Sequence, residues 1–169
     1  MAFSSLADTF AASVEFNPDK TWLEGYIKPA ISFKTRNDQL NFYGNYSVVL
    51  SATAEQDAYD KGDSGRLTLE EAYLGINYVL NDGVSFDFSV GPREKKLGTG
   101  MLIANGGSSG FERGALKFGP RKAWEMAAMG TFNVSDFDIT GLYLDANEVP
   151  SNDTNTTLNG VDVNYVLGQ

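Results

Sequence analysis

The chain has 169 residues, a formal net charge of −9, and neither cysteine nor histidine. This length is enough for one domain, so we predict a single β-barrel domain, or a fragment of one, over residues 1–169. The missing cysteine and histidine exclude disulfides, thiol nucleophiles, histidine bases and the usual zinc and haem ligands. We therefore predict a protein that is not an enzyme and needs no cofactor or metal. The acidic charge also argues against a nucleic-acid partner.

Apolar and polar residues alternate through most of the chain, which is the pattern of strands with one apolar face. Pro29 interrupts one such segment, where it predicts an irregularity because proline cannot donate a hydrogen bond to a neighbouring strand. The predicted strands cover residues 9–16, 22–34, 40–51, 71–80, 84–91, 124–132, 137–144 and 161–167. Most of these eight strands are longer than the strands of about 5–6 residues that are usual in soluble proteins.

The connections between these strands alternate in length. Short turns at 35–38, 81–83 and 133–136 are separated by long polar connections. Outer-membrane barrels have short turns at the periplasmic end and longer loops outside. The sequence therefore predicts an antiparallel up-and-down transmembrane β-barrel in the bacterial outer membrane. It is either a complete barrel of eight strands or half of a larger porin of about 16–18 strands.

The longest connection, residues 91–124, is basic, although the chain is acidic overall. It contains seven basic and two acidic residues, a net charge of +5. One interpretation is that it folds inward and lines or narrows a pore over about 93–122, where its cations attract anions. The other is that it stays outside, where its cations bind anionic lipopolysaccharide or balance acidic neighbours. Apolar residues within it favour the inward position, since a solvated loop would not need them.

The candidate site residues are the charges of this connection and of the predicted polar strand faces. The pore-lining or anion-binding candidates are Arg93, Lys95, Lys96, Arg113, Lys117, Arg121, Lys122, Lys28 and Lys34. The acidic candidates on the same faces are Glu24, Glu71, Asp87 and Glu125. Acidic clusters elsewhere do not have the spacing of a calcium-binding loop, so we predict no metal site.

Residues 69–107 resemble the alginate-export-type outer-membrane porins. The resemblance rests on Glu71-Ala72-Tyr73-Leu74, on Val90-Gly91-Pro92-Arg93 and on the glycine-rich segment 98–103. It implies a monomeric channel with an arginine- and lysine-rich lumen for acidic sugars or other anions, with Arg93 as a pore charge. Pro92 departs from the family pattern, and family members are more than twice as long. The chain then corresponds to half of such a barrel, which a second half or a second copy would complete.

The predicted function is an outer-membrane, porin-like channel for small anionic or sugar solutes, in contact with the lipid bilayer and lipopolysaccharide. One alternative is a non-conducting, eight-stranded membrane barrel that binds partners or has a structural role through its outer loops. A second alternative is a soluble β-barrel in which the apolar stripe forms the core and holds a small apolar ligand. The charged strand faces are compatible with the channel and with both alternatives. The alternation of short and long connections and the length of the strands favour the two membrane proteins over the soluble barrel.

Overall fold

The computed structural model describes residues 18–56, 62–107 and 116–165. These residues form an all-β structure that includes a 3-10 turn, η2 (Pro150–Asn152), between its last two strands. The strands are β1 (Leu23–Ile27), β2 (Ala30–Lys34), β3 (Leu40–Ala54), β4 (Gly65–Asn81), β5 (Val84–Val90), β6 (Met126–Val134), β7 (Phe137–Asp145) and β8 (Thr157–Tyr165). In this part of the chain, no helix is long and apolar enough to cross a membrane.

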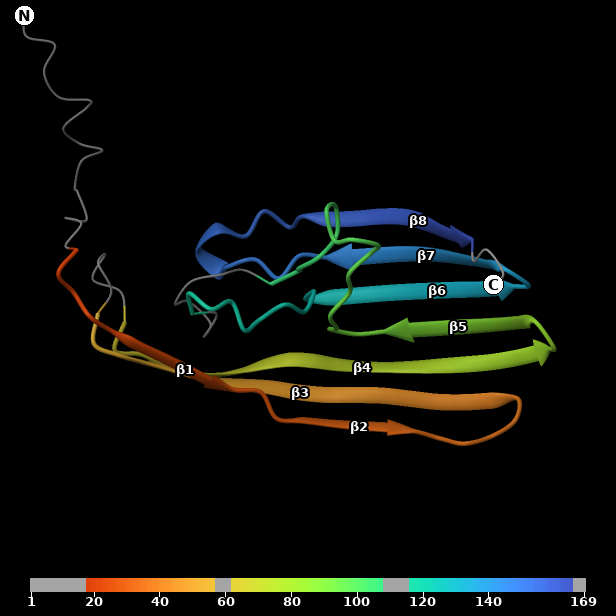
Figure 1. Ribbon diagram of the computed structural model, residues 1–169, viewed down its shortest axis with the longest axis horizontal. Coiled ribbons are helices and arrows are strands. Elements are labelled where there is room, and N and C mark those ends of the chain that lie inside the picture. The colour runs from red at the N-terminus through yellow and green to blue at the C-terminus, as the bar shows by residue number, and fades with distance from the viewer. Residues whose placement is uncertain (1–17, 57–61, 108–115, 166–169) are drawn as a thin grey trace, which may run out of the picture.

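All strands lie in one antiparallel sheet, in the order β1-β3-β4-β5-β6-β7-β8, with β2 also paired to β3 (Figure 1). β1 and β2 are two parts of one edge strand, since they pair with successive segments of β3. The interruption falls at Lys28 and Pro29, where the Pro29 carbonyl still accepts a hydrogen bond from the Val48 N–H, at 3.2 Å. The all-β, antiparallel prediction and the irregularity at Pro29 are thus confirmed. The predicted strand 9–16 lies outside the described residues.

The starts of two strands differ from the prediction by four residues or more. β8 begins at Thr157 rather than at 161, because the polar segment before Val161 pairs with the end of β7, Thr157 opposite Asp145. β4 begins at Gly65 rather than at 71. A β-bulge within the strand changes which positions are apolar, so the first half does not continue the period-2 alternation of the second half. Both differences arise from pairing with a neighbouring strand, which local sequence does not report.

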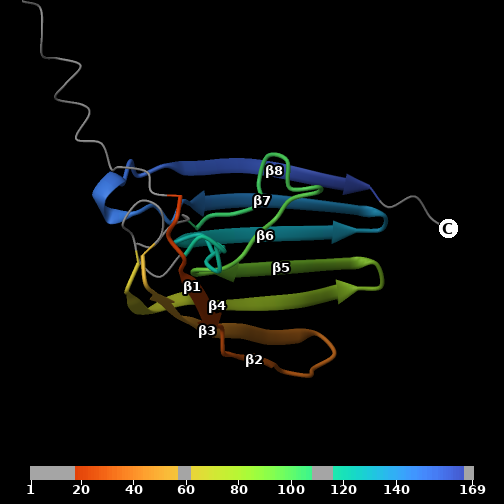
Figure 2. The same ribbon diagram turned by 60° about the vertical axis from the view of Figure 1, so that its left-hand side comes forward.

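Short and long connections lie at opposite ends of the sheet, as Figures 1 and 2 both show. Residues 35–39, 82–83 and 135–136 make the short turns. The long connections at the other end are residues 55–64, 91–125 and 146–156. In the tight turn at 82–83, Gly83 has a φ of 88°, a conformation that glycine adopts without strain. The predicted sorting of connections is therefore present in the fold.

The described strands form an open sheet. β8 pairs with β7 alone, and β1 and β2 pair with β3 alone. Six successive antiparallel pairings separate the two edges, so both edge strands run toward the short-turn end. An antiparallel closure of this sheet consequently needs further strand structure that runs in the opposite direction.

One face of the sheet, here called the apolar face, is exposed and almost entirely hydrophobic. Ile31 is 76% exposed and Val161 is 72% exposed. The large side chains of this face are Leu23, Ile27, Ile31, Phe33, Leu40, Phe42, Tyr46, Leu50, Leu67, Leu69, Leu74, Tyr78, Leu80, Phe86, Phe88, Val90, Met126, Phe132, Phe137, Ile139, Val161, Val163 and Tyr165. Within the described strands, the charged residue that alternation places on this face is Asp145, at the long-loop end of β7.

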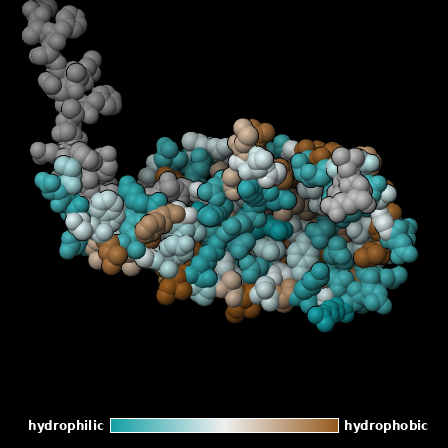
Figure 3. Space-filling model, in the orientation of Figure 1, coloured by the Kyte–Doolittle hydropathy of each residue, from teal (hydrophilic) through white to brown (hydrophobic). Residues whose placement is uncertain are grey.

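The opposite face, here called the polar face, carries small and hydrophilic side chains. Ser47, Ser89 and Thr140 on this face are buried. This distribution is the reverse of a soluble sheet, in which the apolar side is buried and the polar side meets water. In Figure 3, hydrophilic residues run along the middle of the molecule and the most hydrophobic ones stand mainly at its margins.

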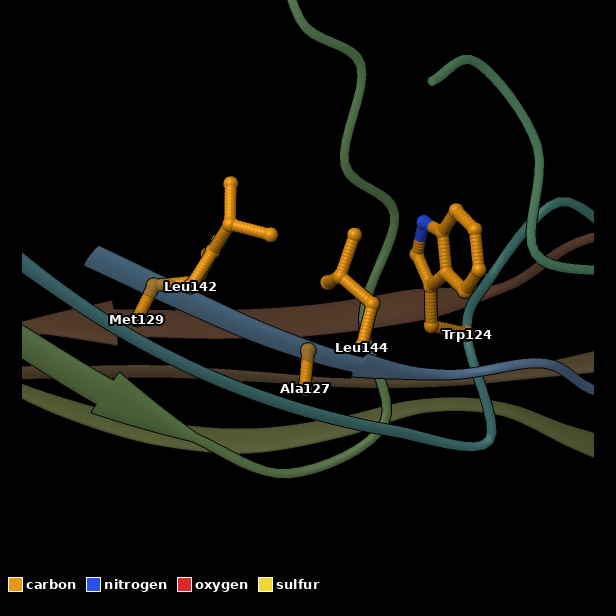
Figure 4. Packing of buried hydrophobic residues seen from close by; sticks show 5 residues of the cluster. All are labelled: Trp124, Ala127, Met129, Leu142 and Leu144. Atoms are coloured by element: carbon orange, nitrogen blue, oxygen red, sulfur yellow. The ribbon is translucent and has the colours of Figure 1, made fainter. Parts of the chain in front are cut away.

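A small hydrophobic cluster lies on the polar face under the long connection. It consists of Trp124, Ala127, Met129, Leu142 and Leu144 (Figure 4). The close-up shows these side chains on the same side of the strands. Leu97 and Ile103, both from the connection between β5 and β6, pack against the cluster. The polar face is therefore apolar at the place where a loop covers it.

This cluster should carry much of the stability of the loop. We expect Leu144→Ala to destabilise the folded protein by about 2–5 kcal/mol, since it leaves a cavity in a buried site. Leu67→Ala, on the exposed apolar face, is the matched control and should cost clearly less. Urea titrations followed by tryptophan fluorescence would measure both, and equal losses would contradict the cluster's role.

Candidate functional site

The described parts of the connection between β5 and β6 lie over the polar face: residues 91–107 cross β6, β7 and β8 (Figures 1 and 2), and residues 121–123 contact Glu70 of β4. Its outgoing limb, residues 91–107, is fixed near its start by hydrogen bonds between Gly91 and Ala127. Its returning limb, residues 116–125, rejoins the outgoing limb, since the Trp124 N–H donates to the Arg93 carbonyl at 3.0 Å. Both described limbs therefore pack against the polar face of the sheet.

Close packing between the two limbs explains one glycine of the loop. A Cβ atom on Gly106 would lie 2.5 Å from Trp124, closer than side chains approach one another. The Gly106 N–H donates to the Lys122 carbonyl at 3.0 Å, and its carbonyl accepts from the Asn147 N–H at 2.7 Å. Residue 106 must therefore be glycine for the limbs to meet here.

Glu70 anchors the returning limb. The register between β3 and β4 passes from Ser47 opposite Glu71 to Val48 opposite Leu69, so Glu70 is the extra residue of a β-bulge. Its side chain is completely buried. Its carboxylate accepts hydrogen bonds from the backbone N–H groups of Lys122, at 2.6 Å, and Ala123, at 3.1 Å.

Two cations also contact the Glu70 carboxylate. The Arg121 Nε lies 3.3 Å from one oxygen and the Lys28 Nζ lies 3.3 Å from the other. Arg121 is 3% exposed and donates a further bond to the Leu69 carbonyl at 3.1 Å. A buried ion pair is costly unless it is well hydrogen-bonded, and Glu70 has the partners that this requires.

Glu71, the second residue of the bulge, anchors the outgoing limb. Its carboxylate accepts a hydrogen bond from the Glu94 N–H at 3.1 Å and another from the Asn45 side-chain amide at 2.7 Å. The Glu94 carboxylate pairs in turn with the Lys28 ammonium. Lys28, placed at the interruption between β1 and β2, therefore links the two limbs to the edge strand.

A second polar group surrounds Arg93. Its guanidinium lies 4.1 Å from the centre of the Tyr73 ring and donates to the Ser89 hydroxyl at 2.6 Å. Tyr43 contacts Tyr73 edge-on and donates to the Asp87 carboxylate at 2.5 Å. Beside these residues lies an open recess of about 450 Å³, lined by Ser32, Phe33, Lys34, Tyr43, Gly44, Tyr73, Asn77 and Asp87. The recess offers a lysine, a carboxylate, an amide and tyrosine hydroxyls on one wall.

Lys95 adds positive charge to the same region. Burial lowers the pKa of its ammonium, and the positive charge of Arg93 lowers that pKa further. The negative charges of Asp162 and Asp87 oppose this shift in part. The positive charge of Arg93 therefore acts electrostatically on the Lys95 ammonium.

The predicted site residues fall into three groups. Arg93, Arg121 and Lys28 are held by the polar contacts described above, and Lys95 is half-buried. Lys34, Lys96, Lys117, Lys122 and Glu125 are exposed.

Of the acidic candidates, Glu71 and Asp87 accept the hydrogen bonds described above. Glu24 accepts hydrogen bonds from the Trp22 indole and the Lys117 backbone N–H. Arg113 lies outside the described residues.

The sequence prediction missed Glu70, which has the most complete set of partners in the site. A signal for it exists in the alternation of β4. Apolar residues occupy odd positions at Leu67 and Leu69 and even positions from Ala72 onward, with two acidic residues between them. This change of phase is what a bulge produces, and it places both carboxylates on one face.

Comparison with protein-family models, with curated proteins and with solved structures finds no match to this chain. The resemblance to alginate-export-type porins therefore rests on its sequence segments and stays a prediction. What the protein does has to be argued from the two faces of the sheet and from the loop.

The electrostatic repulsion between Lys95 and Arg93 gives a testable pH dependence. Because a neighbouring cation favours the neutral amine, Arg93→Gln should raise the pKa of Lys95 toward its ordinary value. Nuclear magnetic resonance of ¹³C-methylated lysines across an alkaline pH series would measure this. Arg36→Gln, in the turn at the opposite end of the sheet, is the control and should leave the pKa of Lys95 unchanged. A Lys95 titration that Arg93→Gln does not move would contradict the coupling.

Proposed function

We propose that this sheet is part of the wall of an outer-membrane β-barrel channel for small anionic or sugar solutes. The observation that carries the proposal is the reversed distribution of side chains. An exposed, charge-poor apolar face is backed by a buried polar face on which a long basic loop lies. Lipid on one side and a water-filled lumen on the other is the environment that this distribution suits.

Strand dimensions support a membrane position. A transmembrane strand needs about 9–11 residues. β3 has 15 residues, β4 has 17, and β6, β7 and β8 have 9 each. Near the short-turn end the apolar face carries aromatic residues, among them Tyr78 and the pair Phe137 and Tyr165, whose tilted rings have their centres 4.7 Å apart. Aromatic residues at a strand end are typical of the interface girdles of outer-membrane barrels.

The position of the loop supports a channel wider than eight strands. The interior of an eight-stranded barrel is filled by the side chains of its own wall. Here the polar face is covered, in addition, by both limbs of the connection between β5 and β6. We therefore favour the larger porin of the two barrels predicted from sequence. Further strands would complete its wall, and the loop would narrow its lumen.

The chemistry of the polar face supports the solute class. Arg93, Lys95 and Lys34 place positive charge around the recess. Arginine presents a planar array of donors that suits carboxylate and phosphate groups. Asp87, Asn77 and the tyrosine hydroxyls offer hydrogen bonds to sugar hydroxyl groups. Some of the basic charge does not contribute, because Glu70 compensates Arg121 in the loop and Lys28 in the edge strand.

A non-conducting membrane barrel is the second candidate, and the packing of the loop favours it. Leu116 is 1% exposed, and Ala123 is completely buried. A loop packed this tightly could close a narrow lumen instead of shaping an open one. Measurement of ion conductance separates the two candidates.

The channel proposal predicts stable ionic current when the closed barrel, in which further strands complete the wall formed by this chain, is inserted into planar lipid bilayers. Arg93→Gln should shift the reversal potential in a salt gradient toward cations, because it removes a fixed positive charge from the lumen. Arg36→Gln also removes one positive charge, but from the short-turn end of the sheet, and should shift the reversal potential much less. Absence of current from a correctly folded, inserted sample would exclude the channel. Equal shifts of the reversal potential in the two variants would show that Arg93 lies outside the conduction path.

The membrane position has its own test. Leu74→Arg places a cation on the apolar face and should reduce the stability of the protein in liposomes by about 2–4 kcal/mol if the site lies near the bilayer centre. Asn77→Arg places the same side chain on the polar face and should cost much less. Folding into liposomes, followed by the change in gel mobility on heating, would measure both. Equal tolerance of the two substitutions would contradict a lipid-facing apolar side.

A further inference from the structure

The two limbs of the loop are held by two consecutive residues of one strand. In a regular strand, neighbouring side chains point to opposite faces, so Glu70 and Glu71 could not both reach the polar face. The bulge at this position removes that restriction, and both carboxylates contact the loop. Glu70 binds the returning limb at 121–123, and Glu71 binds the outgoing limb at Glu94.

We propose that Glu70 and Glu71 form a two-point clamp that positions the loop on the polar face, with Glu70 as the main positioning residue. The clamp sets how far the loop extends from the wall, and so sets the opening that it leaves. This consequence for solutes rests on the proposed channel function. The mechanical role of the clamp does not, because it concerns contacts within the folded chain.

The contacts of Glu70 explain why it is the stronger half of the clamp. It binds two successive backbone N–H groups, of Lys122 and Ala123, which fixes the path of the main chain and not only the position of a side chain. Its bonds are charge-assisted, and such bonds are about twice as strong as neutral ones. They are also removed from water, since the Glu70 side chain is completely buried. Glu71 holds one backbone N–H of the loop and is half-buried.

Glu70 also determines how much positive charge the loop presents. It compensates Arg121 in the returning limb and Lys28 in the edge strand. Removal of its negative charge would leave two cations with less compensation beside the proposed lumen. Glu70 is therefore predicted to influence ion preference as well as loop position, and these two effects can be separated experimentally.

Amide hydrogen exchange of the full chain in detergent tests the clamp without reference to transport. We expect Glu70→Gln to speed exchange in residues 116–125 by tenfold or more, with a smaller effect on residues 92–97. Glu71→Gln should speed exchange mainly in residues 92–97, with a smaller effect on residues 116–125. Glu125→Gln, an exposed carboxylate in the returning limb, is the matched control and should leave both limbs as they are.

A second variant guards against simple misfolding. Glu70→Met combined with Arg121→Met replaces the buried ion pair with apolar side chains of similar volume, which proteins often tolerate. The Lys122 and Ala123 N–H groups still lose their acceptor, so exchange in residues 116–125 should stay fast while β3 and β4 remain protected. Normal protection of this limb in the double variant would overturn the clamp. Equal loosening of both limbs and of β3 and β4 in Glu70→Gln would overturn it as well.

Bilayer recordings test the effect on ion preference. Glu70→Gln should shift the reversal potential toward anions, and the double methionine variant should reverse much of that shift, because it also removes the Arg121 charge. Both variants should show more frequent current fluctuations than the unmodified protein, since the loop is released in both. An unchanged reversal potential in Glu70→Gln would overturn its role in ion preference. A silent unmodified protein would instead refute the channel, and the exchange experiment would still decide the clamp.

Discussion

The structure depends on the alternation of side chains between the two faces of a continuous antiparallel sheet. Each strand has one apolar and one polar side, and the pairing register brings all apolar sides to the same face. An exposed hydrophobic surface of this extent is unfavourable in water, so the face requires an apolar environment. The polar face is consequently the side on which chemistry can take place, and the long loop lies there.

The loop stays on the polar face through two different kinds of contact. Over β6 and β7 it covers a small hydrophobic cluster, in which burial of apolar surface supplies the attraction. Over β4 the contact is ionic and hydrogen-bonded, through the carboxylates of the bulge. The hydrophobic contact holds the loop against the sheet without strong directional preference, whereas the carboxylates fix the path of its backbone. Together the two kinds of contact give the described limbs a defined position.

The charge pattern of the loop has a different meaning in the fold than in the sequence. As a linear segment it carries a net positive charge, which suggests an attraction for anions. In the structure, Arg121, which is buried, forms an ion pair with Glu70. The charged residues that line the recess are Lys34 and Asp87. Arg93 and Lys95 lie near it, since Arg93 contacts the ring of the lining residue Tyr73 and Lys95 interacts electrostatically with Asp87. The positive charge near the recess therefore comes from the start of the loop and, through Lys34, from the edge strand.

The sequence by itself determined the all-β class, most strand positions and the sorting of connections, because alternation and turn residues are local properties. It also located the loop and several residues of its surroundings, such as Arg93 and Asp87, because charge and composition are visible without a fold. The tertiary structure alone decided that the sheet of described strands is open and that Glu70 joins Arg121, Lys28 and the loop backbone. These contacts join residues about 50 positions apart through the register of β3 and β4. Such a register follows from pairing between strands, and no single segment of the chain contains it.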